Sequence, residues 1–413
     1  MKVKITPFKS SGEIVAPPSK SYAHRYIIAA FLSGKPCVIL NAGKSADVNA
    51  TIFALKSLGG IIERKDDAVY FKGKNEIDRA TVDCAESGST LRFLMPVAAA
   101  LGIRSQFTGS ERLLSRPIED IARAIEGHGA KITGHRVEGK LKSGVYRLNA
   151  GVSSQFVSGL LFALSVLCGE SEIVLEGDGV SKGYVDITVS VLKEFGVKVD
   201  KTDAGYRIIG GYDNPPSSVT VEGDWSGSAF PLCVGALCGS ATVKNLKYPT
   251  LQPDGAIVDI LRAFGAEVIV GENFVTAKRG TLVSVKEINC ENFPDIAQVI
   301  SSVAAFCNGE TTLTGVNRLK IKESDRIRAI TDTLFSSGIT AKYDGERIIV
   351  FGGKPKGGEF SGGGDHRTVM SAAVIAAAAE GVSNICGAEH IAKSYPDFFN
   401  DLKILGGKVD VGI

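Results

Sequence analysis

The sequence predicts an α/β protein of two domains, assembled from six copies of one strand and helix unit. Its 413 residues exceed the size at which single hydrophobic cores stop growing, so two domains are expected. With 44% hydrophobic and 22% charged residues, the composition is that of a globular protein able to bury large cores. The two further observations behind this prediction are a repeated glycine phrase and a repeated helix start.

The repeated glycine phrase consists of an apolar helix end, a glycine and then alternating apolar residues. Glycine suits the left-handed residue that closes a helix, and the alternation that follows it is typical of a strand. A period of this length indicates a repeat architecture. The phrase recurs at intervals of about 70 residues, at Gly59, Gly129, Gly196, Gly265, Gly338 and Gly406.

The second phrase lies upstream in each unit, where Ser, Asp or Gly precedes an apolar pattern of helical period. Such residues are favoured as helix N-caps, so each unit is expected to run strand, helix, strand, helix and then a pair of strands. Helix N-termini attract anions, so six of them around one cleft would suit binding of phosphate and carboxylate groups. The alternative is that the Ser, Asp and Gly residues of these phrases only cap their helices. The phrases are SKSYAHR from Ser19, ESGSTLR from Glu86, SSQF from Ser153, DWSGSAF from Asp224, FPDIAQ from Phe293 and GGDHRTVM from Gly363.

Charge and cysteine content exclude several classes of protein. A formal net charge of +2 lacks the basic excess of a nucleic-acid or membrane-surface binder. The N-terminus has no secretory signal, and no apolar segment is long enough to span a bilayer. None of the eight cysteines forms a CxxC pair, which argues against a zinc or redox motif. We therefore expect a cytoplasmic protein with no metal and no cofactor.

Several charged motifs are candidates for anion binding, each with a plainer alternative. Lys20, Ser21 and Arg25 crowd one helix start, where the helix dipole disfavours cations unless an anion compensates. The run from Lys322 to Arg326 is either a ligand site or a solvated helix face. Asp295 is either an N-cap or a general base.

Two further segments are less decisive. Asp365-His366-Arg367 follows three glycines, so it is either a flexible loop or a site where Arg367 binds a carboxylate or phosphate. Gly43-Lys44-Ser45 follows an apolar strand pattern, as in a nucleotide-binding P-loop. That motif needs a glycine five residues before Gly43, where Val38 stands, so we reject it.

Taken in order, the motifs resemble the 5-enolpyruvylshikimate-3-phosphate (EPSP) synthase family of enolpyruvyl transferases almost from end to end. The resemblance implies two similar domains of three βαβαββ repeats each, an inside-out α/β barrel that binds substrate as the domains close. It places one domain at residues 18–222, the shikimate 3-phosphate side, and the other at 1–17 with 223–413, which completes the phosphoenolpyruvate site. The nine motifs are PPSKSYAHR, ESGSTLRF, SRPIEDI, SSQF, SKGYVDIT, FPDIAQ, KIKESDRI, GGDHRTVM and IAKSYPDFF.

The resemblance also implies a role for individual residues. Asp295 would take the proton from the substrate 5-hydroxyl, Glu323 would protonate the methylene carbon, and Lys20 would stabilise charge at the reacting centre. Arg92 and His366 would support the site. The shikimate 3-phosphate set is Lys20, Ser21, Arg25, Ser153, Ser154, Gln155, Ser181, Asp295 and Lys322, and the phosphoenolpyruvate set is Lys20, Gly88, Arg116, Gln155, Arg326, Arg367 and Lys393.

Two positions depart from the family pattern. Glu86 stands where many members have Asn, and this carboxylate would repel phosphate unless it pairs with a neighbour such as Arg92. Arg318 stands where the family often has a substrate-binding Asn, so we transfer no role to it.

The resemblance implies transfer of the enolpyruvyl group of phosphoenolpyruvate to the 5-hydroxyl of shikimate 3-phosphate with release of phosphate, and this reaction explains the demand for cations. Two substrates with two phosphates, each about −1.5 to −2 at neutral pH, and two carboxylates must bind together, which fixed Lys and Arg side chains permit without a metal. One alternative is the sister enzyme UDP-N-acetylglucosamine enolpyruvyl transferase. That enzyme typically carries a cysteine in the loop before its Arg-Pro pair, whereas this chain has none there. A second alternative is a non-catalytic protein that binds phosphorylated metabolites. Such a protein would not need Asp295 and Glu323, and both carboxylates are present. By resemblance we expect a monomer whose partners are its two anionic substrates.

Overall fold

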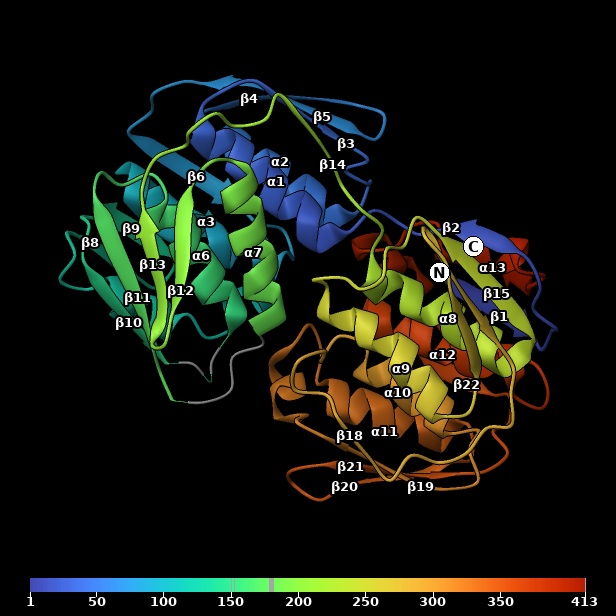
Figure 1. The fold of residues 1–413 in the computed structure, drawn as a ribbon. Helices are drawn as coiled ribbons and strands as arrows, with labels where there is room; N and C mark the ends of the chain where they lie inside the picture. The colour runs from blue at the N-terminus through green and yellow to red at the C-terminus, as the bar shows by residue number, and fades with distance from the viewer. Residues whose placement is uncertain (150, 152, 178–181, 413) are drawn as a thin grey trace. The chain divides into compact units, whose positions relative to one another are not determined.

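The computed structural model describes residues 1–149, 151, 153–177 and 182–412. The chain forms two compact units, Pro18–Glu222 (the N-terminal unit) and Met1–Pro17 with Gly223–Ile413 (the C-terminal unit). Each unit contains three four-stranded sheets (Figure 1). Among the described helices, none is long and apolar enough to cross a membrane.

The N-terminal unit repeats one pattern of strands and helices three times. Its first sheet joins β14 (Ser218–Thr220), β3 (Cys37–Leu40), β5 (Ala68–Lys74) and β4 (Gly60–Lys65), with helices α1 (Lys20–Ser33) and α2 (Ala46–Ser57). The second joins β6 (Arg79–Asp83), β7 (Arg104–Thr108), β9 (Arg136–Gly139) and β8 (Ala130–Thr133), with α3 (Gly88–Leu101), α4 (Glu111–Leu114) and α5 (Glu119–Ile125). The third joins β10 (Val145–Asn149), β11 (Glu170–Glu176), β13 (Gly205–Ile209) and β12 (Lys198–Thr202), with α6 (Ser154–Leu164) and α7 (Lys182–Glu194).

The C-terminal unit has the same pattern. Its first sheet joins β2 (Glu13–Val15), β15 (Ser240–Lys244), β17 (Phe274–Lys278) and β16 (Glu267–Val270), with α8 (Trp225–Cys238), η1 (Pro253–Ala256) and α9 (Ile257–Ala263). The second joins β18 (Glu287–Asn289), β19 (Gly309–Thr314), β21 (Ile348–Gly352) and β20 (Thr340–Tyr343), with α10 (Ala297–Ala304), η2 (Asn317–Ile321) and α11 (Arg326–Ser336). The third joins β22 (Glu359–Ser361), β23 (Ser383–Cys386), β1 (Lys2–Thr6) and β24 (Lys408–Val411), with α12 (His366–Ala378), η3 (Ala388–Lys393) and α13 (Phe398–Ile404).

The strand pairing explains why residues 1–17 belong with the second half of the chain. β1 pairs antiparallel with both β23 and β24, and β2 pairs parallel with β15. In every sheet the first two strands are parallel and the remaining pairs are antiparallel, for example β6 with β7 and β8 with β9. The six sheets confirm the predicted βαβαββ repeats.

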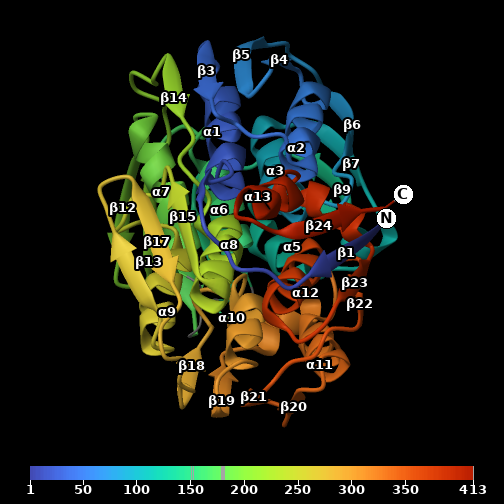
Figure 2. The ribbon, with the colours of Figure 1, turned by 90° about the vertical axis from the view of Figure 1, so that its right-hand side faces the viewer.

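In each unit the sheets lie outside and the apolar helices lie inside. Almost all of α3 and α12 is buried, and the cores of the two units gather around such helices. A helix that is apolar on every side is stable only when it is surrounded, which is why these helices occupy the centre. Figure 2 shows α8, α10 and α12 inside the strands of the C-terminal unit. This arrangement confirms the predicted inside-out α/β fold.

The glycine phrase has the predicted conformation in all six repeats. The φ angles of Gly59, Gly129, Gly196, Gly265, Gly338 and Gly406 lie between 78° and 95°, in the left-handed region. A strand begins one or two residues after each of them. A side chain at Gly196 would also collide with the backbone of Asp213, which lies 1.7 Å from the position of an added Cβ. These glycines therefore end one helix of each repeat and turn the chain into the hairpin.

Five of the six predicted helix starts carry a side-chain cap. Ser19, Ser87, Ser153, Asp224 and Asp365 each accept a hydrogen bond from a backbone N–H in the first turn of α1, α3, α6, α8 and α12. The exception is α10, which has no such bond. In the rejected P-loop sequence, Ser45 caps α2 and Lys44 forms an exposed ion pair with Asp67.

Candidate functional site

In the N-terminal unit, the predicted site residues lie at the starts of α1, α3 and α6. Lys20 is the first residue of α1, and its ammonium lies 2.9 Å from a carboxylate oxygen of Asp47 in the first turn of α2. Both side chains are largely buried, at 17% and 7% exposure. Asp47 thus compensates the cation that the α1 dipole disfavours, and it fixes where the ammonium lies.

Arg25 is buried one turn into α1 and makes its contacts within the unit. Its guanidinium donates to the Thr188 hydroxyl over 2.7 Å, to the Tyr184 carbonyl over 2.9 Å and to the Ser21 carbonyl over 2.7 Å. It also stacks on the Phe93 ring. Burial lowers the pKa of Arg25 to about 10. Arg25 therefore joins α1 to α7 and α3, which is a positioning role that the sequence did not predict.

Gly88 and Arg116, both predicted to bind phosphoenolpyruvate, are in contact. Gly88 is the first residue of α3, and an added Cβ there would lie 2.6 Å from Nη1 of Arg116. Only glycine therefore lets this guanidinium lie against the helix start.

Gln155 connects α6 to α3. Its Oε1 accepts a hydrogen bond from Arg92 over 2.9 Å, and its Nε2 donates to Ser89 over 3.0 Å. Arg92 also stacks on the Phe156 ring. Ser153 caps α6 and Ser154 begins it, so both hydroxyls lie at a helix N-terminus as predicted. Ser181 lies outside the described residues.

In the C-terminal unit, three cations surround the carboxylate of Asp295. Oδ2 lies 3.0 Å from Arg367, while Oδ1 lies 2.9 Å from Arg326 and 3.4 Å from Lys322. Burial alone would raise the pKa of Asp295, but attraction to Arg367, Lys322 and Arg326 outweighs it and holds that pKa well below the usual range. Residues from three helix starts, far apart in sequence, therefore meet at one carboxylate.

Arg326, at the start of α11, binds three carboxylates at once. It donates to Asp365 over 2.8 Å, to Glu323 over 2.7 Å and to Asp295 over 2.9 Å. Burial disfavours the charged guanidinium, but the three carboxylates more than compensate and raise the pKa of Arg326. The two predicted proton-transfer residues, Asp295 and Glu323, are thus linked through one guanidinium.

Arg367 and Lys393 complete the predicted cations of this unit. Arg367, in the first turn of α12, donates to the Ser226 hydroxyl over 2.8 Å and to the Asp295 carbonyl over 3.0 Å, and it is only 4% exposed. His366 precedes it, and its ring lies 3.4 Å from Asp365. Lys393 is buried at the end of η3, which packs against α12.

The two departures from the family pattern have different surroundings. Arg318 is half-buried in η2 and donates to the Glu291 carbonyl over 2.8 Å. Glu86 is exposed just before the Ser87 cap of α3. The hydrogen bond from Arg318 to the Glu291 carbonyl thus stays within its own repeat.

The sequence reasoning missed several residues that hold the predicted ones. Asp47, Asp365 and Ser226 are the partners of Lys20, Arg326 and Arg367. Each lies in the first turn or at the cap of a helix, so an acidic or hydroxyl residue at a helix start was a usable signal. Thr188 lies in the SKGYVDIT motif, but only the fold brings it to Arg25.

Comparison with known proteins agrees with this picture. A family model described as "EPSP synthase (3-phosphoshikimate 1-carboxyvinyltransferase)" matches residues 6–402. A protein of Clostridium kluyveri named 3-phosphoshikimate 1-carboxyvinyltransferase is 40% identical, covering 99% of this chain and 98% of that protein. One of the same name from Clostridium beijerinckii is 36% identical over the same shares.

Solved structures give the same result for the fold. An EPSP synthase structure from Acinetobacter baumannii aligns with a TM-score of 0.83 and 26% identity, covering 99% of this chain and all of that one. The enolpyruvyl transferase NikO of Streptomyces tendae, at 17% identity and a TM-score of 0.78, covers 99% of this chain and 98% of that one and shares the fold. These matches confirm the family resemblance that the nine motifs indicated.

Proposed function

The chain belongs to the EPSP synthase family, the 3-phosphoshikimate 1-carboxyvinyltransferases, and we propose which of its residues bind the substrates and move the protons. The reaction transfers the enolpyruvyl group of phosphoenolpyruvate to the 5-hydroxyl of shikimate 3-phosphate and releases phosphate. The observation that supports these roles best is the Asp295 carboxylate, held by Arg326, Arg367 and Lys322 with Glu323 on the same Arg326.

Asp295 is the base and Glu323 the acid of the addition step. The 5-hydroxyl oxygen bonds to C2 of phosphoenolpyruvate while Asp295 takes its proton and Glu323 gives a proton to the methylene carbon. The tetrahedral intermediate then returns a proton from that carbon to Glu323 and expels phosphate, which restores the double bond, and the leaving phosphate takes the proton that Asp295 holds. General acid and base groups of this kind typically contribute about 10²–10⁴-fold each.

The cations around Asp295 also control its basicity. In the free protein they hold its pKa well below the usual range, so it is a weak base. Substrate phosphate and carboxylate groups that bind Arg326, Arg367 and Lys322 compete with Asp295 for these cations. Asp295 then holds a proton more strongly, so that substrate binding itself makes it a better base.

The remaining residues bind the two substrates. Gly88, Arg116, Gln155, Arg326, Arg367 and Lys393 bind phosphoenolpyruvate; Ser21, Arg25, Ser153, Ser154, Gln155, Ser181 and Lys322 bind shikimate 3-phosphate; and Lys20 contacts both. Arg25 acts in part by positioning the start of α1, because its hydrogen bonds go to Thr188 and to two carbonyls. Arg92 supports Gln155 through their 2.9 Å hydrogen bond.

The test is phosphate release with both substrates present. We expect release only when phosphoenolpyruvate and shikimate 3-phosphate are both added, and none when UDP-N-acetylglucosamine replaces the latter. Calorimetry should show binding of shikimate 3-phosphate and much weaker binding of shikimate, since charged hydrogen bonds to the phosphate are lost. Binding of both substrates without turnover would instead identify a non-catalytic binding protein.

The proposal also covers the oligomeric state and the cellular location of the protein. We propose a monomer, which sedimentation at micromolar concentration tests directly. We also propose that it works in the cytoplasm, because the eight cysteines are free thiols and six of them are buried. Fractionation of cells that express a tagged chain would check this.

A further inference from the structure

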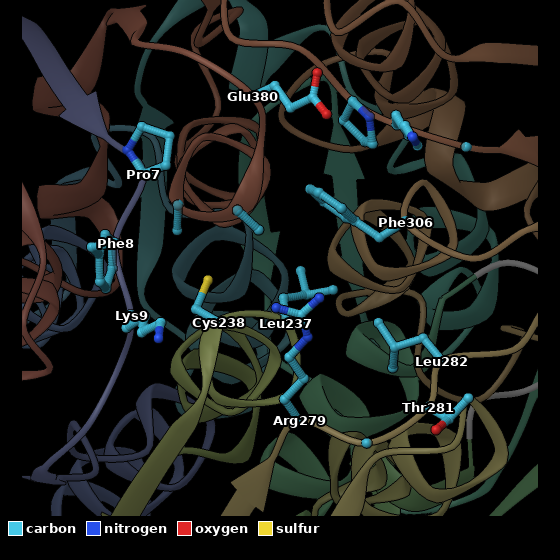
Figure 3. A pocket seen from close by; sticks show the side chains of 16 residues that line it. Pro7, Phe8, Lys9, Leu237, Cys238, Arg279, Thr281, Leu282, Phe306 and Glu380 are labelled. Atoms are coloured by element: carbon cyan, nitrogen blue, oxygen red, sulfur yellow. The ribbon is translucent and has the colours of Figure 1, made fainter.

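The C-terminal unit contains a pocket of about 680 Å³ where α8, α10 and α12 end (Figure 3). Leu237 and Cys238 belong to the last turn of α8, Ala377 and Ala378 end α12, and Phe306 follows α10. The predicted catalytic and binding residues lie at the opposite ends of these helices. Since α12 has 13 residues, the pocket is separated from His366 and Arg367 by about 20 Å of helix.

Apolar side chains form one part of the pocket lining, which we call its apolar floor. They belong to Phe8, Leu237, Leu282 and Phe306, and Pro7 and Pro355 also line the pocket. Figure 3 shows Phe306 and Leu282 on one side and Phe8 and Pro7 on the other. Burial raises the pKa of the Cys238 thiol to about 12, so this sulfur is a neutral part of the lining. The volume lies within the range of small-molecule sites, which combine an apolar lining with a few polar groups.

Three exposed cations surround this floor, one from each repeat of the unit. Lys9 follows β1, Arg279 follows β17 and Lys354 follows β21, so the pseudo-threefold arrangement of the repeats places them around the same helix ends. Within the described part of the chain, none of the three forms an ion pair or a side-chain hydrogen bond. Glu380 is the one carboxylate in the lining, which leaves an excess of positive charge.

The cations are not needed to cap the helices. Backbone N–H groups of the same loops already bind the carbonyls there: Phe8 donates to Ala377, Ser10 to Cys238 and Gly353 to Ala305. Arg279 donates to the Gly239 carbonyl through its own N–H, not through its guanidinium. The side chains of Lys9, Arg279 and Lys354 therefore remain available for a ligand.

We propose that this pocket binds a small organic polyanion, an aromatic or apolar body that carries two or three carboxylate or phosphate groups. The body packs on Phe8, Phe306 and Leu282, and the anionic groups pair with Lys9, Arg279 and Lys354. Charge-assisted hydrogen bonds of this type are short and strong, and Arg279 offers a planar fork to a carboxylate or phosphate. The pocket is independent of the proposed transferase function, because it contains none of the residues assigned to that reaction.

The experiment is calorimetric titration of the full chain with benzene-1,3,5-tricarboxylate, which combines an aromatic ring with three anionic groups. Propane-1,2,3-tricarboxylate keeps the charges without the ring, and benzoate keeps the ring with one charge. We expect the aromatic tricarboxylate to bind at least tenfold more tightly than either. A parallel titration with phenyl phosphate distinguishes a phosphate-bearing ligand from a carboxylate-bearing one.

Variants assign the binding to the pocket. The triple variant K9Q/R279Q/K354Q should weaken binding of the tricarboxylate at least tenfold, without loss of transferase activity. The matched control K4Q/K247Q/K286Q removes three exposed cations of the same unit that do not line the pocket, and it should bind as the unaltered chain does. Phe306→Leu keeps the apolar floor but removes the ring, so it should reduce the preference for the aromatic ligand.

Two results would overturn the proposal. One is equal affinity of the triple variant and the unaltered chain, which would mean that the ligand binds elsewhere, including the anion site at the other helix ends. The other is equal loss of affinity in the pocket variant and the control variant, which would mean that the ligand responds only to net charge. Melting curves of both triple variants show whether each is folded.

Discussion

The guanidinium of Arg326 lies 2.8 Å from the carboxylate of Asp365, and neither side chain is more than 1% exposed. Asp365 also caps α12 by accepting the N–H of Arg367, and it accepts a hydrogen bond from Ser324. One buried ion pair therefore ties the start of α11 to the start of α12. The same arginine holds Asp295 and Glu323, so this pair sets where the two proposed proton-transfer groups lie.

We expect Asp365→Ala to lower the free energy of unfolding by about 3–5 kcal/mol, because it removes the fully buried one of the three carboxylates that compensate the buried Arg326 guanidinium. Asp365→Asn should lose less, since asparagine remains a good N-cap for α12. Urea unfolding followed by circular dichroism measures both. Asp344→Ala, which breaks the exposed pair with Arg347, is the control and should change little. Equal losses at Asp365 and Asp344 would contradict the role given to this pair.

Asp295→Asn should reduce turnover by about 10²–10⁴-fold, because an amide cannot accept the hydroxyl proton. The variant keeps the size of the side chain, so shikimate 3-phosphate should still bind with similar affinity. Phosphate release with both substrates gives the rate, and calorimetry gives the affinity. Turnover near that of the unaltered chain would remove Asp295 from the mechanism.

Arg367→Ala should weaken binding of phosphoenolpyruvate by about ten- to a hundredfold, since one charge-assisted hydrogen bond contributes about 1.5–3 kcal/mol. Binding of shikimate 3-phosphate should change less. Ser226→Ala is the matched control, because it removes a partner of Arg367 but leaves the guanidinium in place. Equal effects of Arg367→Ala on the two substrates would contradict its assignment to phosphoenolpyruvate.

Gly88→Ala should weaken phosphoenolpyruvate binding without destabilising the fold. The new methyl group would lie 2.6 Å from Nη1 of Arg116, so the guanidinium must move away from the start of α3. Alanine is a better helix residue than glycine, so the melting temperature should be unchanged or slightly higher. Substrate titrations and melting curves check the two halves of this prediction. A fall in melting temperature with unchanged affinity would show that Arg116 is not a ligand.

Stability should fall as the pH drops below about 4. Attraction to the neighbouring cations outweighs burial and lowers the pKa of both Asp295 and Asp365 in the folded protein. A carboxyl with a lowered folded pKa contributes its full stability above its unfolded pKa of about 3.9, and it loses that contribution as the pH falls towards the folded value. Urea unfolding between pH 3 and 7 should show this, with a weaker pH dependence in Asp365→Asn. An identical pH dependence in the variant would contradict it.

The sequence predicted the repeat architecture because its signals are local. A glycine that must adopt a positive φ, as at Gly59, and a cap residue such as Ser87 act within one turn of helix, so they can be read without the fold. The positioning role of Arg25 shows the limit. Its motif suggested a ligand contact, whereas its bonds to Thr188 and Tyr184 depend on how α1 packs against α7.

The sequence alone determined the family, the six repeats and the residue types at each helix start. The repeat period and the capping pattern depend only on the order of residues along the chain. Only the tertiary structure decided which charges meet. Asp295 and Arg326 come from the second repeat of the C-terminal unit and Arg367 from the third, and they share hydrogen bonds because α10, α11 and α12 begin close together in the folded unit. Ion pairs depend on distances of a few ångströms between residues far apart in the chain, and no local pattern encodes them.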